Sequence, residues 1–225
     1  MNLGRIQRVH GVLFDLDGTL IDSAPDLAGA ANRLRGEHGL PPLPESELRP
    51  MVGAGARGMV GVAFGVGPQD ARFDELRDAF LARYEEGLLQ RTCVFDGVDA
   101  MLRALEDRGI PWGIVTNKAA RFTMPIVEGL GLAARAAVVV CGDTTPRAKP
   151  YPDSLLFAAA ALTLPPPGIV YVGDDHRDAL AAQAAGMPML AAAWGYLGKG
   201  EPIDAWGADA MIDDPAGVLN WLGWA

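Results

Sequence analysis

Two carboxylates one residue apart, Asp15 and Asp17, are the side chains of this sequence best placed to do chemistry. They follow the apolar residues 12–14, which predict a buried strand of a parallel sheet, and they precede Gly18 and Thr19. Open α/β sheets bind their ligands at the C-terminal ends of strands. Two acids about 5–6 Å apart in a dry crevice repel each other, so one must take a proton or a cation must lie between them.

Polar residues also mark the ends of other predicted elements. These are Thr116 and Asn117 after the apolar residues 112–115, Asp174 and Asp175 after residues 169–172, and Lys149 before a helix over residues 153–162. Since the C-terminal ends of parallel strands share one edge of the sheet, we expect these side chains to converge. Several carboxylates together need a hard cation with oxygen ligands, and Mg²⁺ is the common choice. A cation beside a hydroxyl and a lysine suits a phosphate group.

The elements that must position these residues alternate between strands and helices after residue 92. We predict strands over residues 112–115, 136–140, 169–172, 188–192 and 209–212, with helices over 97–108, 121–130 and 153–162. This alternation predicts βαβ units and an α/β core with a doubly wound, parallel, Rossmann-like sheet.

Residues 22–92 contain no convincing strand. Helices are predicted over 24–38, 57–64 and 70–90, with Ser23 as the N-cap of the first. An all-helical block directly after the first strand of a parallel sheet is best interpreted as an inserted domain. We therefore expect an α/β core domain made of residues 1–21 and 93–225, and a helical cap domain made of residues 22–92.

Composition limits the classes of function. The 225 residues are half apolar and carry a formal net charge of −9, which argues against a nucleic-acid partner. The two cysteines, Cys93 and Cys141, do not indicate a disulfide scaffold. The first eight residues lack the apolar segment of a signal peptide. With no apolar run long enough to span a membrane, we expect a cytoplasmic protein with no membrane partner, a monomer or a homodimer. Lysine occurs only at positions 118, 149 and 199, so each position is informative.

Four of these stretches resemble the motifs of the haloacid dehalogenase superfamily, in the family's order. They are Asp15-Leu-Asp17-Gly-Thr19, the strand-terminal Thr116, Lys149 followed by Pro150, and Gly173-Asp174-Asp175. Any one of these motifs alone would be weak evidence for the family. The helical insertion after the first motif resembles the C1 type of cap found in that superfamily.

The resemblance implies a role for each residue. Asp15 would attack phosphorus and form an aspartyl-phosphate, and Asp17 would act as general acid and base. Mg²⁺ would be held by the Asp15 carboxylate, the Asp17 backbone carbonyl and Asp174. The hydroxyl of Thr116, the amide of Asn117 and the charge of Lys149 would bind the phosphoryl group. For Asp175 and Asp178, supporting roles around the metal and ordinary structural roles both remain open.

A second pattern, Gly53-Ala-Gly55-Ala-Arg-Gly58, matches the glycine fingerprint of dinucleotide-binding proteins. That fingerprint requires a preceding strand, and residues 44–50 are acidic and bracketed by prolines. We therefore interpret it as a glycine-rich turn into a cap helix, which in C1-capped relatives faces the core. Arg57 is then the candidate cap residue for contacting an anionic substrate, with a surface arginine as the alternative.

The superfamily supports several reactions. Enzymes of the family that remove halide lack the second acid of the first motif, so the presence of Asp17 argues against dehalogenation. Phosphonoacetaldehyde hydrolysis needs a lysine in the cap, and no lysine precedes residue 118. A phosphoglucomutase-type isomerase keeps all four motifs and stays open, whereas a catalytically silent binding protein would lack Asp15 or Asp17. We predict a Mg²⁺-dependent phosphatase of a small phosphorylated metabolite.

Two groups of phosphatases share stretches with this chain. The closest resemblance is to phosphoglycolate phosphatases, through residues 15–23, 95–97 and 172–175. Residues 55–59, 112–122, 194–196 and 206–209 look more like N-acetylmuramic acid 6-phosphate phosphatases of cell-wall recycling. The leaving group stays open between glycolate, an amino sugar and a hexose.

Overall fold

A six-stranded parallel sheet forms the centre of the computed structural model, which describes residues 9–224. The strand order is β5-β4-β1-β6-β7-β8, and every neighbouring pair is parallel. The strands are β1 (Gly11–Phe14), β4 (Trp112–Val115), β5 (Val138–Val140), β6 (Ile169–Gly173), β7 (Met189–Ala192) and β8 (Ala210–Ile212). The predicted doubly wound α/β class is confirmed. The expectation of no signal peptide concerns residues 1–8, which lie outside the described residues.

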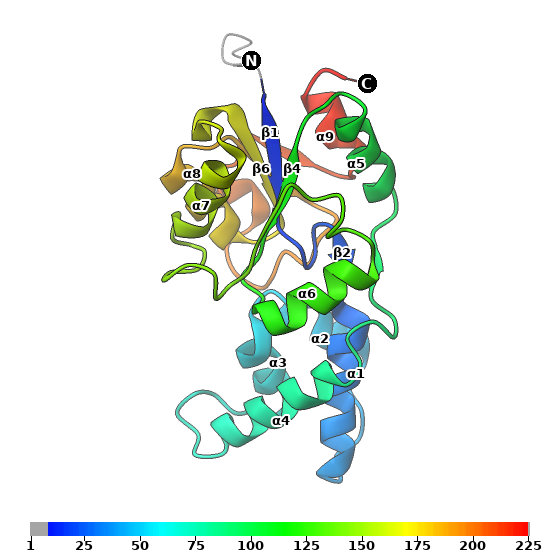
Figure 1. Cartoon of the computed structure of the whole chain (residues 1–225). Helices are drawn as coiled ribbons and strands as arrows, with labels where there is room; N and C mark the ends of the chain where they lie inside the picture. Colours follow the sequence, from blue (N-terminus) through cyan, green and yellow to red (C-terminus); the bar gives the residue numbers. More distant parts are fainter. Residues whose placement is uncertain (1–8, 225) are drawn as a thin grey trace.

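Helices cover both faces of this sheet (Figure 1). On one side lie α7 (Asp153–Leu162) and α8 (His176–Ala185), and on the other α5 (Val98–Glu106) and α9 (Ala216–Trp221). Alternate residues of β1 face opposite sides, as a strand requires: Val12 and Phe14 pack in one core cluster and Leu13 in the other. All four residues of β1 are buried, so the strand can place the residues after it with little freedom.

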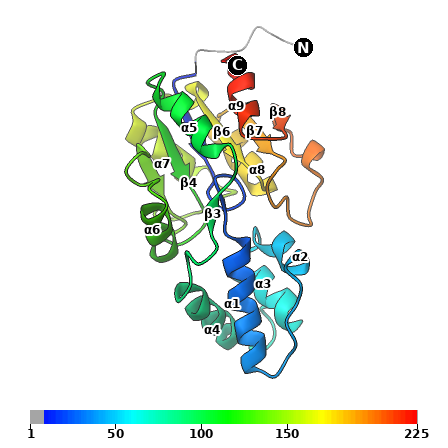
Figure 2. The same ribbon diagram turned by 90° about the vertical axis from the view of Figure 1, so that its right-hand side faces the viewer.

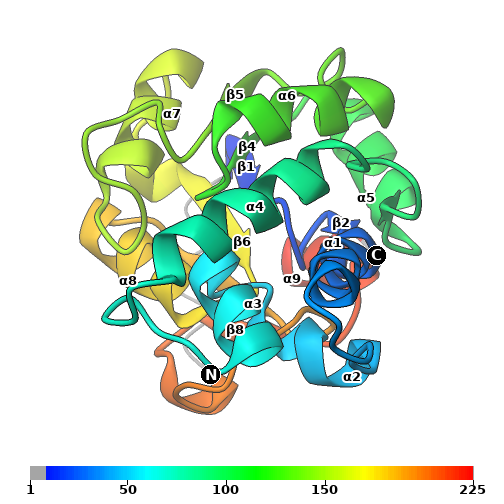
Figure 3. The ribbon, with the colours of Figure 1, turned by 90° about the horizontal axis from the view of Figure 1, so that it is seen from below.

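Four helices lie together beyond the C-terminal edge of the sheet (Figures 1 and 2). They are α1 (Ala24–Glu37), α2 (Glu45–Leu48), α3 (Gly55–Phe64) and α4 (Phe73–Glu85). Seen along the strands, α1, α3 and α4 lie across that edge, with α6 (Ala120–Gly129) of the α/β part beside α4 (Figure 3). The helix predicted over residues 70–90 is shorter than expected, because turns replace it after Glu85.

A two-stranded antiparallel ribbon carries the chain into and out of these helices. Its strands are β2 (Ile21–Asp22) and β3 (Cys93–Val94). The buried carboxylate of Asp26, in the first turn of α1, accepts hydrogen bonds from the backbone N–H groups of Arg91 and Thr92 and from the Thr92 hydroxyl. Both crossings are thereby fastened to each other. Across residues 9–224, none of the helices has the length and apolar character needed to cross a bilayer.

Candidate active site

Asp15 occupies the first position after β1, at the C-terminal edge of the sheet. Its backbone N–H donates to Val172 of β6, and its Oδ1 accepts from the backbone N–H of Leu16 at 2.8 Å. Oδ1 also lies 2.9 Å from Nζ of Lys149. Burial raises the pKa of Asp15 to about 7, Lys149 opposes the rise, and the nearby Asp178 adds to it.

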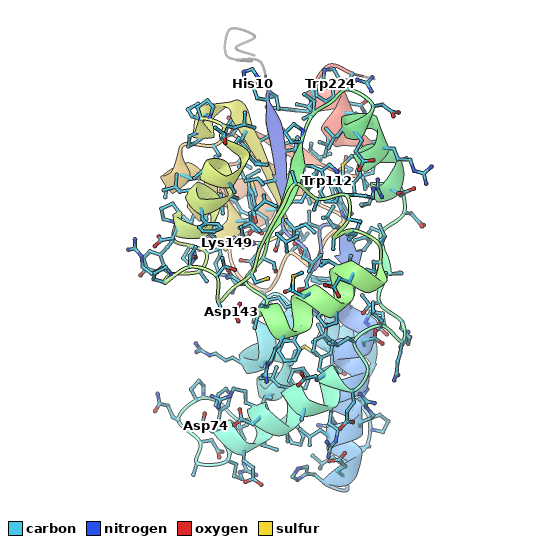
Figure 4. The ribbon with its side chains drawn as sticks, viewed as in Figure 1. His10, Asp74, Trp112, Asp143, Lys149 and Trp224 are labelled. Carbon is cyan, nitrogen blue, oxygen red and sulfur yellow. The ribbon has the colours of Figure 1, made fainter. Side chains whose placement is uncertain are left out.

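Lys149 is only 4% exposed and lies near the lower edge of the sheet (Figure 4). Its Nζ contacts Asp178 Oδ1 at 2.7 Å and donates to the Tyr171 hydroxyl at 2.8 Å and the Val115 carbonyl at 3.0 Å. Burial disfavours the ammonium, but the two carboxylates outweigh it and raise the pKa of Lys149. The lysine is therefore a fixed positive charge beside Asp15.

Asp174 comes directly after β6 and is itself buried. Its Oδ1 accepts from the Thr19 hydroxyl at 2.9 Å and its Oδ2 from the backbone N–H of Tyr196 at 2.8 Å. Burial, reinforced by Asp15 and Asp178, raises the pKa of Asp174 well above its usual range. A carboxyl in this state needs either a proton or a cation.

Carboxylate oxygens of Asp15, Asp174 and Asp178 lie within 4.8 Å of one another. Oxygen ligands at this spacing fit a hard divalent cation. Asp178 already accepts from Tyr171 and pairs with Lys149, so Asp15 and Asp174 have the greater freedom to bind a metal. Asp178 also completes the capping box of α8 by accepting from the backbone N–H of Asp175.

Asp17 turns away from this cluster toward the ribbon. Its carboxylate accepts from the Ser23 hydroxyl and lies 2.7 and 2.9 Å from Nζ of Lys118. Burial disfavours the charge of Lys118, but Asp17 prevails and raises the pKa of this lysine. Sequence reasoning missed both partners of Asp17. For Lys118, the scarcity of lysine and its place two residues after Thr116 were the available signals.

Thr116 and Asn117 lie where predicted, after β4. The Thr116 hydroxyl accepts from the backbone N–H of Lys118 at 3.1 Å. The Asn117 side chain makes two hydrogen bonds of 2.9 Å to the backbone of Lys149, one from its Nδ2 and one to its Oδ1. Asn117 therefore helps to position the lysine, a function that the sequence did not indicate.

A cavity of about 480 Å³ joins these residues to the helices beyond the sheet. Its lining includes Asp15, Asp17, Thr116, Asn117, Lys149 and Asp174, so the structure brings six of the seven predicted site residues together. Arg57 is the exception: it lines a neighbouring cavity of about 620 Å³ instead. The arginine that reaches from the core to the helices is Arg177, which donates to the Gly53 carbonyl and pairs with Asp175.

Comparison with known proteins agrees with this geometry. The family model described as haloacid dehalogenase-like hydrolase matches residues 12–192. A phosphoglycolate phosphatase of Xanthomonas campestris is 46% identical, with 96% of this chain and 97% of the relative aligned. An N-acetylmuramic acid 6-phosphate phosphatase of Pseudomonas aeruginosa is 40% identical over 96% and 95% of the two chains.

Solved structures share the whole architecture. A crystal structure from Haemophilus somnus, described as a predicted phosphoglycolate phosphatase, has a TM-score of 0.84 and 28% identity, and the match covers 96% of this chain and 99% of that one. The chain belongs to the haloacid dehalogenase-like hydrolase family, which confirms the resemblance. Within that family it is a phosphatase, as its sequence predicted.

Proposed function

We propose that the protein hydrolyses a small phosphomonoester through a phosphorylated Asp15, with Mg²⁺ as cofactor. The observation that carries this proposal is the contact between Lys149 Nζ and Asp15 Oδ1 at 2.9 Å, beside the carboxylates of Asp174 and Asp178. An ion pair on the protein surface would be screened by water and would not favour attack by the carboxylate. Here a buried cation offsets the charge of a carboxylate at the floor of a cavity, which suits attack on an anionic ester.

Asp15 would attack phosphorus, so the ester oxygen leaves and an aspartyl-phosphate forms. Asp17 would give a proton to the leaving oxygen and later take one from the attacking water. Ser23 and Lys118 hold the Asp17 carboxylate in place from two sides. The hydroxyl of Thr116 and the ammonium of Lys149 would bind phosphoryl oxygens.

Asp15 and Asp174, with the backbone carbonyl of Asp17, would hold the Mg²⁺. When bound, the ion neutralises phosphate charge and aligns the ester for in-line displacement. Thr19 and Tyr196 bond to Asp174 and keep its carboxylate turned toward Asp15. Asp178 stays with Lys149 and keeps the ammonium near the nucleophile.

Residues 22–92 would act as a cap that closes over the bound ester and excludes water. Within the described residues, the backbone passes between the cap helices and the sheet only through the ribbon of β2 and β3. Arg57 remains a candidate contact for a substrate long enough to enter the second cavity.

The first candidate substrate is 2-phosphoglycolate, which the relative with 46% identity is named for. The second is N-acetylmuramic acid 6-phosphate, the name of the relative with 40% identity. A cavity of about 480 Å³ has room for a sugar ring, so its size is compatible with N-acetylmuramic acid 6-phosphate as substrate.

The test is release of phosphate from p-nitrophenyl phosphate with Mg²⁺, comparing the wild-type protein with Asp15→Asn. We expect turnover that depends on Mg²⁺ and is lost in the variant. Equal activity in the two proteins would refute Asp15 as nucleophile. A comparison of kcat/KM on the two candidates then identifies the leaving group, because a hundredfold preference equals about 2.7 kcal/mol of transition-state discrimination.

A further inference from the structure

Apolar side chains from three helices line part of the cavity. Leu27 of α1, Phe80 and Leu81 of α4, and Phe122 of α6 supply its walls. Within these walls three groups can donate hydrogen bonds from side chains: the hydroxyl of Tyr84, the ammonium of Lys118 and the guanidinium of Arg121. This arrangement makes the compartment selective for a ligand that accepts hydrogen bonds.

Tyr84 carries the clearest sign that something is to be bound. The side chain is 1% exposed, yet its hydroxyl has no hydrogen-bond partner among residues 9–224. Buried polar groups are nearly always paired, so an unpaired hydroxyl on a residue of the cavity lining offers a donor to a bound ligand. Burial raises the pKa of Tyr84, which keeps the hydroxyl protonated and able to donate.

Lys118 lies between this hydroxyl and the proposed general acid. Its Nζ is 4.9 Å from the centre of the Tyr84 ring and 2.7 Å from Asp17 Oδ1. An ammonium has three N–H donors, and the only carboxylate it meets in the described chain is that of Asp17. Two of these donors serve the two oxygens of Asp17, which leaves the third for a further acceptor near the ester oxygen.

Arg121 lies at the rim, with its guanidinium carbon 4.4 Å from the centre of the Phe122 ring. It makes no ion pair with any residue from 9 to 224, whereas Asp175, the other acid near the rim, is paired with Arg177. The charge of Lys118 is balanced by Asp17, whereas that of Arg121 is not cancelled by an ion pair within the described chain.

We propose that Tyr84, Lys118 and Arg121 bind a carboxylate on the leaving group, so that the substrates are phosphomonoesters of hydroxy acids. This inference rests on the proposed function. Glycolate and muramic acid, in the names of the two relatives, are both carboxylic acids, although they differ greatly in size. Both leaving groups would bring a carboxylate into the same cavity, next to the ester oxygen in glycolate and across the sugar ring from it in muramic acid.

Two matched pairs of substrates test this. The first pair is 2-phosphoglycolate and 2-hydroxyethyl phosphate, in which an alcohol replaces the carboxylate. The second is N-acetylmuramic acid 6-phosphate and N-acetylglucosamine 6-phosphate, which lacks the lactyl group that carries the carboxylate. We expect kcat/KM to favour the acid by about thirtyfold or more in at least one pair. Tyr84→Phe should lower that preference about fivefold, and Lys118→Met about tenfold or more.

The preference, rather than the rate, is the readout, because a variant that merely disturbs packing slows both members of a pair. Lys199→Met is the matched control: it removes the same charge from the second cavity, and the preference should stay as in the wild type. Preferences below threefold in both pairs, with normal hydrolysis of p-nitrophenyl phosphate, would overturn the carboxylate subsite alone. A preference that survives Tyr84→Phe and Lys118→Met, or that disappears in Lys199→Met, would overturn its location. Absence of p-nitrophenyl phosphate hydrolysis would instead refute the proposed function.

Discussion

Gly18 lies directly against the carboxylate of Asp174. A Cβ atom added to Gly18 would lie 2.0 Å from Asp174 Oδ2. The backbone φ at this position is +88°, a value that residues other than glycine rarely adopt. The glycine after the first pair of acids therefore makes room for the acid that comes after β6, 156 residues later in the sequence. Asp174 approaches Asp15 because nothing projects from residue 18.

We expect Gly18→Ala to lower kcat at least about a hundredfold and to weaken Mg²⁺ binding, since Asp174 must move. The control is Gly39→Ala, which also has a positive φ, +70°, but no atom within 4 Å of the added Cβ. Backbone strain is common to both variants, so any difference reports the displaced carboxylate. Similar activity and metal affinity in the two variants would contradict the assignment.

Lys149→Met removes the buried charge next to Asp15. We expect kcat on p-nitrophenyl phosphate to fall about 10²–10³-fold, as is typical when a group that stabilises transition-state charge is lost. Steady-state kinetics measure the effect, and circular dichroism checks that the variant is folded. Lys199→Met, at an exposed position, should keep the wild-type kcat. If the two lysine variants behave alike, Lys149 does not act on the phosphoryl group.

Metal binding should release protons and should weaken as the pH falls below 7. The pKa of Asp15 is raised to about 7, mainly by burial, so below that pH the metal must displace a proton from this carboxyl. About one pH unit above that pKa Asp15 is already ionised and no longer contributes, so any proton still released there comes from Asp174, whose pKa burial also raises. Titration calorimetry with Mg²⁺ in two buffers of different ionisation enthalpy counts the protons. An equal enthalpy in both buffers about one unit below the pKa would show that no proton is displaced.

The sequence was sufficient to predict the sheet edge and the gathering of most candidate residues at it, for a physical reason. Buried parallel strands are continuous apolar runs, and their C-terminal ends share one edge, so local patterns at Asp15, Thr116 and Asp174 converge without any knowledge of packing. Contacts that depend on side-chain direction could not be predicted in this way. The pairing of Lys118 with Asp17 joins residues 101 positions apart, and although the place of Lys118 after Thr116 puts it near the site, no local pattern identifies Asp17 as its partner.

Arg57 illustrates the same limit. Its place in a glycine-rich turn suggested a contact with substrate, but the turn continues into α3, which begins at Gly55, and position 57 faces a second cavity. Arg177 follows the acidic Asp174-Asp175 pair near the start of α8, and nothing in that pattern indicates a contact with the other helices. Its side chain nonetheless reaches the Gly53 carbonyl. Which arginine crosses between two packed parts depends on helix rotation, which a single sequence does not specify.

Asp26 should contribute strongly to stability although it is far from the chemistry. Its buried carboxylate accepts from the backbone of Arg91 and Thr92 and from the Thr92 hydroxyl, with distances of 2.7–3.0 Å. Asp26→Ala leaves these donors unpaired in the interior, so we expect the free energy of unfolding to fall by about 3 kcal/mol. Urea denaturation measures this change. A loss of Mg²⁺-dependent turnover should be much smaller than in Asp15→Asn.

Asp74→Ala is the matched control for Asp26→Ala, because both aspartates lie in the first turn of a helix, where the helix dipole stabilises a carboxylate. Asp74 lies in α4, at the periphery of the four helices beyond the sheet, with its side chain 79% exposed, and pairs with Arg77 (Figure 4). A surface pair of this kind contributes less than about 1 kcal/mol. The difference between the two variants therefore isolates the bonds that fasten the two crossings of the ribbon. If both variants lose the same stability, Asp26 acts only as a helix-terminal charge and the crossings are held by packing instead.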